Sequence, residues 1–248
     1  ANAIAYLQAA IDKGLDPNKF GRQISFFFNA HNGFLTEIAK FRAARIIWAT
    51  IMKDRFGVTD KKALKCRFHT QTGGSTLTAT HIDNNVVRTT IQALSAVLGG
   101  TQSLHTNSCD EALGLPTDEA VKLALRTQQI IAHESEIPNY PDPFGGSYII
   151  EELTNDFVTE SLKIIERIDG MGGTVSAIKK GWIQNEIARS AYEYQKELDS
   201  KKQIIVGVNQ FEDKKNIEAD IFEIDENKVK KQVQSVIILK ESRNNDLV

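Results

Sequence analysis

A polar stretch between two long amphipathic segments constrains this sequence most. Residues 99–116, GGTQSLHTNSCDEALGLP, read as a Gly-Gly break, a strand over Thr101–Asn107 and a loop, after which Thr117 caps a helix. A buried parallel strand is ordinarily rich in Val, Ile and Leu, whereas this strand carries Thr, Gln, Ser, His and Asn. Because buried polar groups need hydrogen-bond partners, we expect one face of the strand to line a space that takes a polar ligand.

Two further strands precede the polar one, and each strand is followed by a helix. The strands are expected at Gln23–Asn29 and Leu64–Thr72, and the helices at Glu37–Phe56, Asn85–Leu98 and Thr117–Glu134. Short connections between alternating strands and helices indicate parallel neighbours, so the chain is predicted to be α/β, with a barrel or a doubly wound sheet. No glycine-rich nucleotide loop follows a strand, which argues against a nucleotide-binding fold.

All three strands place polar or small side chains on one face, because side chains alternate along a strand. These side chains are Gln23, Ser25, His69, Gln71, Ser103, His105 and Asn107. An ordinary (β/α)₈ barrel is filled with branched apolar side chains instead. We therefore predict a barrel wall that faces a solvated or ligand-filled axis. The alternative is that these polar residues sit only at strand ends and contact loops.

The second half of the chain is mostly helical. Helices are expected at Leu153–Ile168, Thr174–Lys180 and Gln184–Leu198, a short strand within Lys201–Phe211, and a one-faced helix at Lys228–Lys240. So few strands cannot close an eight-stranded barrel. We expect residues 1–135 to supply part of a barrel wall and residues 136–248 to form a helical extension and linker, with the missing strands supplied from elsewhere.

Composition narrows the class of partner. The 248 residues carry a net charge of −2 without a long run of one sign, which gives no electrostatic reason to bind nucleic acid or a membrane surface. Cys66 and Cys109 lack the spacing of metal ligands, so we expect two free thiols and a cytoplasmic location.

Several residues near the expected strand ends could carry chemistry. His69 and His105 lie where barrel active sites collect, although a lone histidine is more often structural, and a zinc site from this pair lacks further ligands. Glu111 could accept hydrogen bonds from a ribose or an amide, or could simply cap a helix. Ser25 and Ser103 have no base nearby in sequence, which gives a hydrolase triad little support.

Five motifs in order resemble the large catalytic chain of the methylmalonyl-CoA mutase family. They are RFHTQTGGSTLTA (67–79), NNVVRT (84–89), GGTQSLHTNSCDEALGLPT (99–117), DPFGGSY (142–148) and IIVGVNQF (204–211). The resemblance implies an isomerase: a (β/α)₈ barrel threaded by an acyl-CoA, with adenosylcobalamin at the C-terminal end of the strands. It implies a carbon-skeleton rearrangement, methylmalonyl-CoA to succinyl-CoA, in which the cofactor carries the radical chemistry.

The resemblance also implies roles for individual residues. His69 and Gln71 match the catalytic positions of the HxQT motif, and Ser25 matches a serine that contacts coenzyme A. Gln23 stands where the family commonly has Arg, so Arg22 beside it could compensate. The implied acyl-CoA contacts are Gln23, Ser25 and Phe27, and the implied cofactor contacts are Gly74, Glu111, Ala112 and Gly114.

Other family features do not occur in this sequence. The catalytic Tyr-His pair, the substrate-binding Arg and Tyr and the cobalt-ligating D-x-H-x-x-G are not found, so the axial histidine is expected outside this chain. We therefore expect an internal segment that needs the remaining barrel segment, a cobalamin-binding domain or subunit, and an oligomer. Alternatives are an isobutyryl-CoA or 2-hydroxyisobutyryl-CoA mutase, or a non-catalytic half-barrel that serves assembly.

Overall fold

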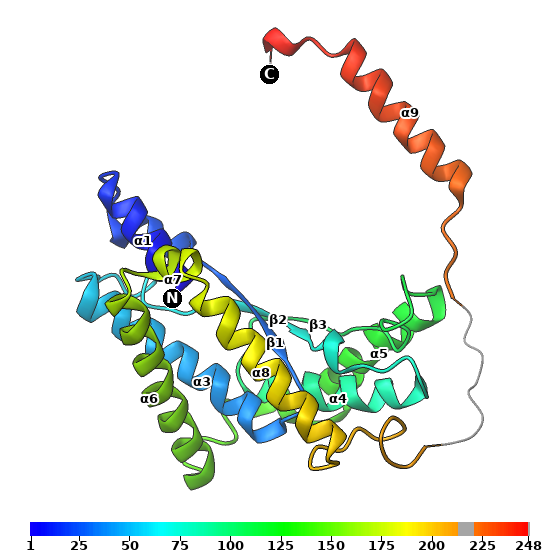
Figure 1. The fold of residues 1–248 in the computed structure, drawn as a ribbon, viewed down its shortest axis with the longest axis horizontal. Coiled ribbons are helices and arrows are strands. Elements are labelled where there is room, and N and C mark those ends of the chain that lie inside the picture. The colour runs from blue at the N-terminus through cyan, green and yellow to red at the C-terminus, as the bar shows by residue number, and fades with distance from the viewer. Residues whose placement is uncertain (213–220, 248) are drawn as a thin grey trace.

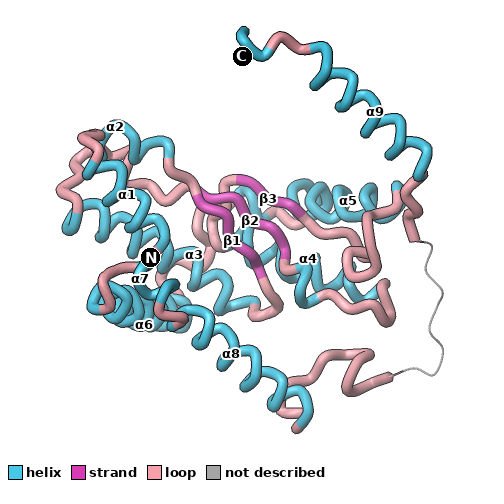
Figure 2. Tube along the Cα trace, turned by 45° about the horizontal axis from the view of Figure 1, so that its top comes forward, coloured by secondary structure: helices cyan, strands magenta, loops and turns pink. Residues whose placement is uncertain are grey.

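The computed structural model describes residues 1–212 and 221–247, a mixed α/β structure with one small parallel sheet (Figure 1). The strands are β1 (Phe26–Ala30), β2 (Phe68–Thr72) and β3 (Ser103–His105). They lie side by side in the order β1-β2-β3, and all pairs are parallel (Figure 2). The predicted α/β class is confirmed, and the described residues form three strands of a sheet rather than a closed barrel.

Helices follow each strand and then dominate the rest of the chain. Before and between the strands lie α1 (Asn2–Asp12), α2 (Pro17–Phe20), α3 (Phe34–Thr50) and α4 (Asp83–Leu98), and α5 (Asp118–Glu134) follows β3. After them come α6 (Tyr148–Gly170), α7 (Thr174–Lys179), α8 (Trp182–Asp199) and α9 (Glu226–Ser242). Thr117 caps α5 as predicted, because its hydroxyl accepts a hydrogen bond from Ala120 N.

Aromatic side chains join one face of the sheet to α3. Phe26 meets the Trp48 indole edge to face at 4.9 Å between ring centroids, and Phe41 stacks on Phe68 at 5.3 Å. Phe28 contacts both Phe41 and Phe68. Such pairs add about 0.5–1.5 kcal/mol each to the burial of their apolar area. The even-numbered side chains of β1 therefore hold the sheet to its helix, and the odd-numbered ones are left on the opposite face.

An arginine joins α3 to the second half of the chain. Arg42 donates from Nη1 to both carboxylate oxygens of Asp142, at 2.6 and 2.7 Å, and from Nη2 to Glu151 Oε1 at 2.7 Å. Glu151 also accepts from Gly146 N. The hydrogen bond to Asp142 raises the pKa of Arg42. The loop that carries Asp142 and the first turn of α6 are thereby fixed beside α3, where Figure 1 places α6.

The thiol of Cys66 lies in the core between α3 and β2. It is buried and belongs to the same cluster as Trp48 and Phe68, and burial raises its pKa to about 11. At pH 8 we expect iodoacetamide to modify Cys66 roughly 100-fold more slowly in the native protein than in urea, because the thiolate is the reactive form. Mass spectrometry of the labelled peptides measures this rate. Equal rates in the two states would contradict the burial of the thiol.

All four predicted strands differ from the structure, and the second begins at Phe68 instead of Leu64. Gln23 ends a 3₁₀ turn that continues from α2, so β1 begins at Phe26 instead of Gln23. The third strand ends at His105, because Asn107 turns its side chain onto β2. The segment 204–208 forms no strand: Gly207 has φ +78°, and only an isolated bridge joins Val206 to Gln210.

The predicted helices are confirmed, with shifted ends. The largest shifts are at α3, which ends at Thr50 instead of Phe56 and continues as a π-helix over Ile51–Arg55, and at α6, which begins at Tyr148 instead of Leu153. The tail helix α9 is present, and all of its residues are exposed, so no described part of the chain covers its apolar positions. Among the described residues, none of the helices is both long and apolar enough to span a membrane.

Candidate active site

The candidate site is the face of the sheet opposite the aromatic core. The strand register places Phe27 beside His69 and His69 beside Ser103. Two residues further along the strands, it places Gln71 beside His105. Phe27, Ser103 and His105 are exposed, and His69 and Gln71 are half-buried. The predicted polar face is therefore confirmed for β2 and β3. The alternative, in which polar residues occur only at strand ends, is wrong for His69, which lies within β2.

Two neighbours fix the imidazole of His69. Its Nδ1 lies 2.7 Å from Ser103 Oγ on β3, and its ring lies 5.1 Å from that of Phe27 on β1, tilted by 53°. Three successive strands thus contribute one side chain each to a single row. Because Ser103 engages Nδ1, Nε2 is the nitrogen left to a ligand; no described residue hydrogen-bonds to it.

Next to the row of Phe27, His69 and Ser103, toward the C-terminal ends of the strands, a series of hydrogen bonds links the side-chain amides of Gln71 and Asn107 to Thr72. Gln71 Nε2 donates to Asn107 Oδ1 at 2.8 Å. Asn107 is buried and donates from Nδ2 to Thr72 O at 3.0 Å, and its backbone N donates to Thr72 Oγ1 at 2.8 Å. Asn107 therefore orients the Gln71 amide and joins the loop after β3 to β2.

Two glycines bring the backbone close to this chain of amides. Gly73 N donates to Ala30 O at 2.7 Å and to Gln92 Oε1 at 2.8 Å. A Cβ added at Gly74 would lie 2.9 Å from Asn107 Nδ2 and 3.4 Å from Glu111 Oε1. A larger residue at position 74 would thus displace the side chains beside it, so only glycine fits between these two loops.

The loop after β3 carries the remaining predicted cofactor contacts. Glu111 and Ala112 are exposed, and Glu111 lies next to Gly74. A Cβ at Gly114 would lie 3.6 Å from Ile221 Cγ2, its one described neighbour within 4 Å, so Gly114 is not brought to Gly74. Asp110 anchors the loop, because its buried carboxylate accepts from Thr117 N and Oγ1 at 2.9 and 3.2 Å.

The thiol of Cys109 lies in this same loop. Burial and the nearby Asp110 carboxylate raise the pKa of Cys109.

Within residues 1–212 and 221–247, no group of three or more His, Cys, Asp or Glu side chains is placed to hold a metal ion.

Some predicted residues lie outside the row of polar side chains. Gln23 and Ser25 precede β1 and are exposed. They are thus separated from Gly74 and Glu111 by the length of the strands.

The sequence interpretation missed the side chains of α4 that support the site. Gln92 is fully buried and donates from Nε2 to Asn32 Oδ1 and Thr76 Oγ1, at 2.6 and 2.7 Å, while accepting from Gly73 N. Asn85 and Thr89 share its face of the helix and are also buried. Polar residues at helical spacing on the buried side were the signal that could have identified them.

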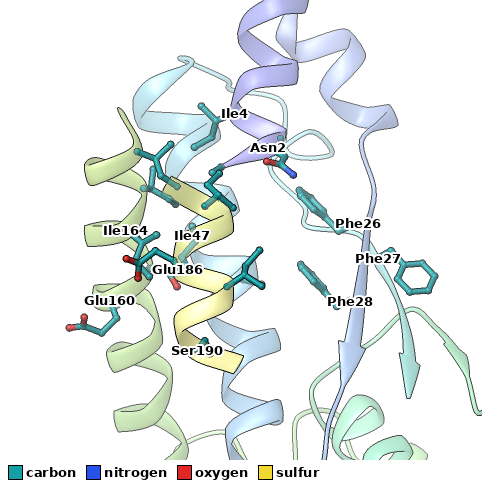
Figure 3. A pocket seen from close by; sticks show the side chains of 18 of the residues that line it. Asn2, Ile4, Phe26, Phe27, Phe28, Ile47, Glu160, Ile164, Glu186 and Ser190 are labelled. Carbon is teal, nitrogen blue, oxygen red and sulfur yellow. The ribbon is translucent and has the colours of Figure 1, made fainter. Parts of the chain in front are cut away.

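A separate groove runs along the free edge of β1. It measures about 1930 Å³ and is lined by α1, α3, α6 and α8 as well as β1. In Figure 3 the rings of Phe26 and Phe28 point into this groove, and the ring of Phe27 points to the other side of the strand. Because β1 pairs only with β2 among the described strands, its second edge lies open beside an apolar groove.

Comparison with known proteins gives matches over nearly the whole chain. The family model described as methylmalonyl-CoA mutase matches residues 1–248. The 2-hydroxyisobutanoyl-CoA mutase large subunit of Aquincola tertiaricarbonis is 44% identical over 234 residues, which cover 94% of this chain and 42% of that protein. The mitochondrial methylmalonyl-CoA mutase of Bos taurus is 42% identical over 248 residues, 100% of this chain and 33% of that protein. The methylmalonyl-CoA mutase large subunit of Porphyromonas gingivalis is 44% identical over 232 residues, which cover 94% of this chain and 32% of that protein. The chain thus spans less than half the length of these relatives.

Proposed function

This chain belongs to the methylmalonyl-CoA mutase family, and we propose that it is a catalytic segment of an adenosylcobalamin-dependent acyl-CoA mutase. The observation that carries this proposal is the polar face of the parallel sheet, on which Phe27, His69 and Ser103 form one row and Gln71 and Asn107 lie beyond it. The reaction proposed is the rearrangement of methylmalonyl-CoA to succinyl-CoA.

The order of the site residues along the strands supports a threaded substrate. Gln23 and Ser25 precede β1, His69 and Gln71 lie within β2, and Gly74 follows it. Parallel strands rise about 3.3 Å per residue, so these three groups form successive levels along one direction. We propose that Gln23, Ser25 and Phe27 contact the acyl-CoA, with the coenzyme end at the first level.

At the middle level, His69 and Gln71 would act on the acyl group. Ser103 engages His69 at Nδ1, which leaves Nε2 to the substrate. In the tautomer whose Nδ1 accepts from the Ser103 hydroxyl, Nε2 carries the hydrogen and can donate it to a thioester carbonyl oxygen. Gln71 has its amide nitrogen engaged by Asn107, which leaves its carbonyl oxygen as an acceptor. These two side chains would orient the acyl group and hold it away from water.

At the third level, the residues present fit a large flat cofactor. Gly74 has no side chain to obstruct a close approach to the backbone, and the Glu111 carboxylate beside it can accept hydrogen bonds from ribose hydroxyls. We propose that Gly74, Glu111, Ala112 and Gly114 contribute to adenosylcobalamin binding. When bound, this cofactor supplies the radical chemistry that protein side chains lack.

The open edge of β1 supports the need for further barrel strands. An unpaired strand edge beside an apolar groove is a site for strand pairing. We propose that the remaining segment of a (β/α)₈ barrel adds a strand here, and that its apolar side chains fill the groove against Phe26 and Phe28. Residues 1–135 would then form part of the barrel wall, and residues 136–248 a helical extension.

Further partners follow from the same proposal. A cobalamin-binding domain or subunit would supply the axial histidine, and the assembled enzyme would be an oligomer. The cytoplasmic location stays a prediction from the sequence, and the Bos taurus relative is named as mitochondrial. The Aquincola relative is named for a different acyl-CoA, so 2-hydroxyisobutyryl-CoA is the substrate to compare first, followed by isobutyryl-CoA.

Assay of the complete protein tests the proposed function. We expect the protein encoded by the full reading frame, loaded with adenosylcobalamin, to convert methylmalonyl-CoA to succinyl-CoA, as measured by mass spectrometry. The same assay with isobutyryl-CoA and 2-hydroxyisobutyryl-CoA distinguishes the alternatives. A folded complete protein that isomerises none of the three would contradict the proposal and favour a non-catalytic assembly role.

The chain of 248 residues by itself is expected to show no turnover. Its sheet presents one row of site residues from three strands, whereas enclosure of the substrate needs the opposite wall. Steady-state assay of the isolated chain with methylmalonyl-CoA and adenosylcobalamin measures this directly. Turnover by the isolated chain would show that the described residues suffice.

A further inference from the structure

A buried row of polar side chains runs along α4. Asn85, Thr89, Gln92 and Ser95 are each at most 2% exposed, and their spacing of three or four residues places them on one face of the helix. Buried amides are costly unless they are hydrogen-bonded. Thr89 Oγ1 has no hydrogen-bond partner among the described residues, so the partners of the amides indicate what the row holds together.

Asn85 joins the two loops that flank the C-terminal edge of the sheet. Its Oδ1 accepts from Thr78 N at 3.1 Å, and its Nδ2 donates to Thr78 O and to Cys109 O, both at 2.8 Å. Arg88 Nη1 also donates to Asn85 Oδ1 at 2.8 Å. All four hydrogen-bonding positions of the amide are thus used. Thr78 belongs to the loop after Gly74, and Cys109 to the loop that carries Glu111.

Arg88 extends the same junction to a third segment. Its Nη1 donates to Thr78 Oγ1 at 3.0 Å, and its Nη2 donates to Val206 O at 2.8 Å. Thr80 Oγ1 donates to Gly207 O at 3.2 Å. Burial lowers the pKa of Arg88. The segment 204–210, distant in sequence, is thereby attached to the outside of the 74–80 loop.

We propose that Asn85 and Arg88 are positioning residues that set the separation of Gly74 from Glu111. A buried amide with every partner satisfied permits one arrangement of the groups around it. Gly74 and Glu111 are neighbours at 3.4 Å, measured from an added Cβ, so a small shift of either loop alters the space between them. Among the described residues, the hydrogen bonds of Asn85 and Arg88 go to Thr78, Cys109, Val206 and each other, and none goes to His69, Gln71 or the residues before β1.

This inference rests on the proposed function only in assigning the two loops to the cofactor. Loosening them is therefore expected to weaken binding of adenosylcobalamin and to leave the binding of acyl-CoA nearly unchanged. A general loss of stability would weaken both to a similar degree.

The decisive variant is Asn85→Asp in the complete protein. Aspartate keeps the shape, the acceptor for Thr78 N and the pairing with Arg88, and it replaces the donor to Thr78 O and Cys109 O by a carboxylate oxygen that repels both carbonyls. Asn85→Ala is the harsher variant, and Asn85→Asp decides if the alanine variant does not fold. Ser95→Ala is the matched control, because Ser95 is equally buried on α4 but donates only to Gln92 O of its own helix.

Two measurements separate the inference from the function on which it rests. We expect hydrogen exchange of the cofactor-free protein to accelerate about tenfold in peptides that cover 74–80 and 109–112, and to stay unchanged in β1 and α3. We expect the Kd for adenosylcobalamin, from absorbance titration, to rise about tenfold, with the KM for acyl-CoA within twofold of wild type. Ser95→Ala should match wild type in both.

Three results would overturn the inference. The first is unchanged exchange in both loops. The second is acceleration spread equally over β1 and α3. The third is accelerated exchange in the loops with an unchanged Kd for adenosylcobalamin. A wild-type complete protein that binds no adenosylcobalamin at all would instead contradict the proposed function, and the exchange data would still decide whether Asn85 holds the loops.

Discussion

Replacing His69 by alanine in the complete protein is expected to lower kcat by about 100-fold or more, within the range that the loss of one preorganised hydrogen-bond donor to a reacting carbonyl oxygen costs. His69 presents Nε2 to the polar face while Ser103 Oγ engages Nδ1 at 2.7 Å. The fold should tolerate the change, because the ring is half-buried on the open face and takes no part in the aromatic core. Steady-state kinetics with the preferred acyl-CoA measures the effect.

Two control variants make the His69 result specific. His133→Ala removes an exposed histidine from α5 and should leave kcat unchanged. Ser103→Ala keeps the imidazole but frees its Nδ1, so we expect a smaller loss of a few-fold, about what one neutral hydrogen bond contributes. A His69→Ala enzyme with wild-type kcat would remove His69 from the mechanism.

Replacing Gly74 by valine is expected to raise the Kd for adenosylcobalamin by about 100-fold, equivalent to about 2.7 kcal/mol. The added Cβ would lie 2.9 Å from Asn107 Nδ2, closer than non-bonded atoms allow. Asn107 cannot easily move aside, because it is buried and bonded to both Gln71 and Thr72. Absorbance titration of the cofactor-free complete protein measures the change.

Gly170→Ala is the matched control for this substitution. Gly170 ends α6, and apart from its chain neighbours and its own helix backbone no described atom lies within 4 Å of an added Cβ there. That variant should bind the cofactor like wild type. If Gly74→Val bound adenosylcobalamin as tightly as wild type, the cofactor would not approach this glycine, and the assignment of the third level would be wrong.

Alternation along the strands was sufficient to predict the face of the sheet that carries the site. His69 and Gln71 lie two residues apart in β2, and Ser103 and His105 two apart in β3, so their relative orientation follows from the pleat alone. The parallel arrangement followed from the intervening helices. That His69 and Ser103 lie directly side by side depends on the register between β2 and β3. The sequence alone did not specify this register.

Contacts between distant segments could not be predicted in the same way. The segment 204–208 has the composition of a strand, but its carbonyl groups are bound by Arg88 and Thr80, more than a hundred residues earlier. Gln23 was placed in a strand by alternation, yet the helical turn that begins at Pro17 continues through it. Local propensity favoured one structure, and long-range hydrogen bonds or the preceding turn determined another.

The bond between Arg42 and Asp142 has a consequence for synthesis of the protein. The two residues are 100 positions apart, and a ribosome adds about 5–20 residues per second. Arg42 therefore emerges about 5–20 s before its acidic partner is made. During that interval the side of α3 that later receives α6 is bare on the nascent polypeptide, and it is a surface that a chaperone acting during translation would encounter.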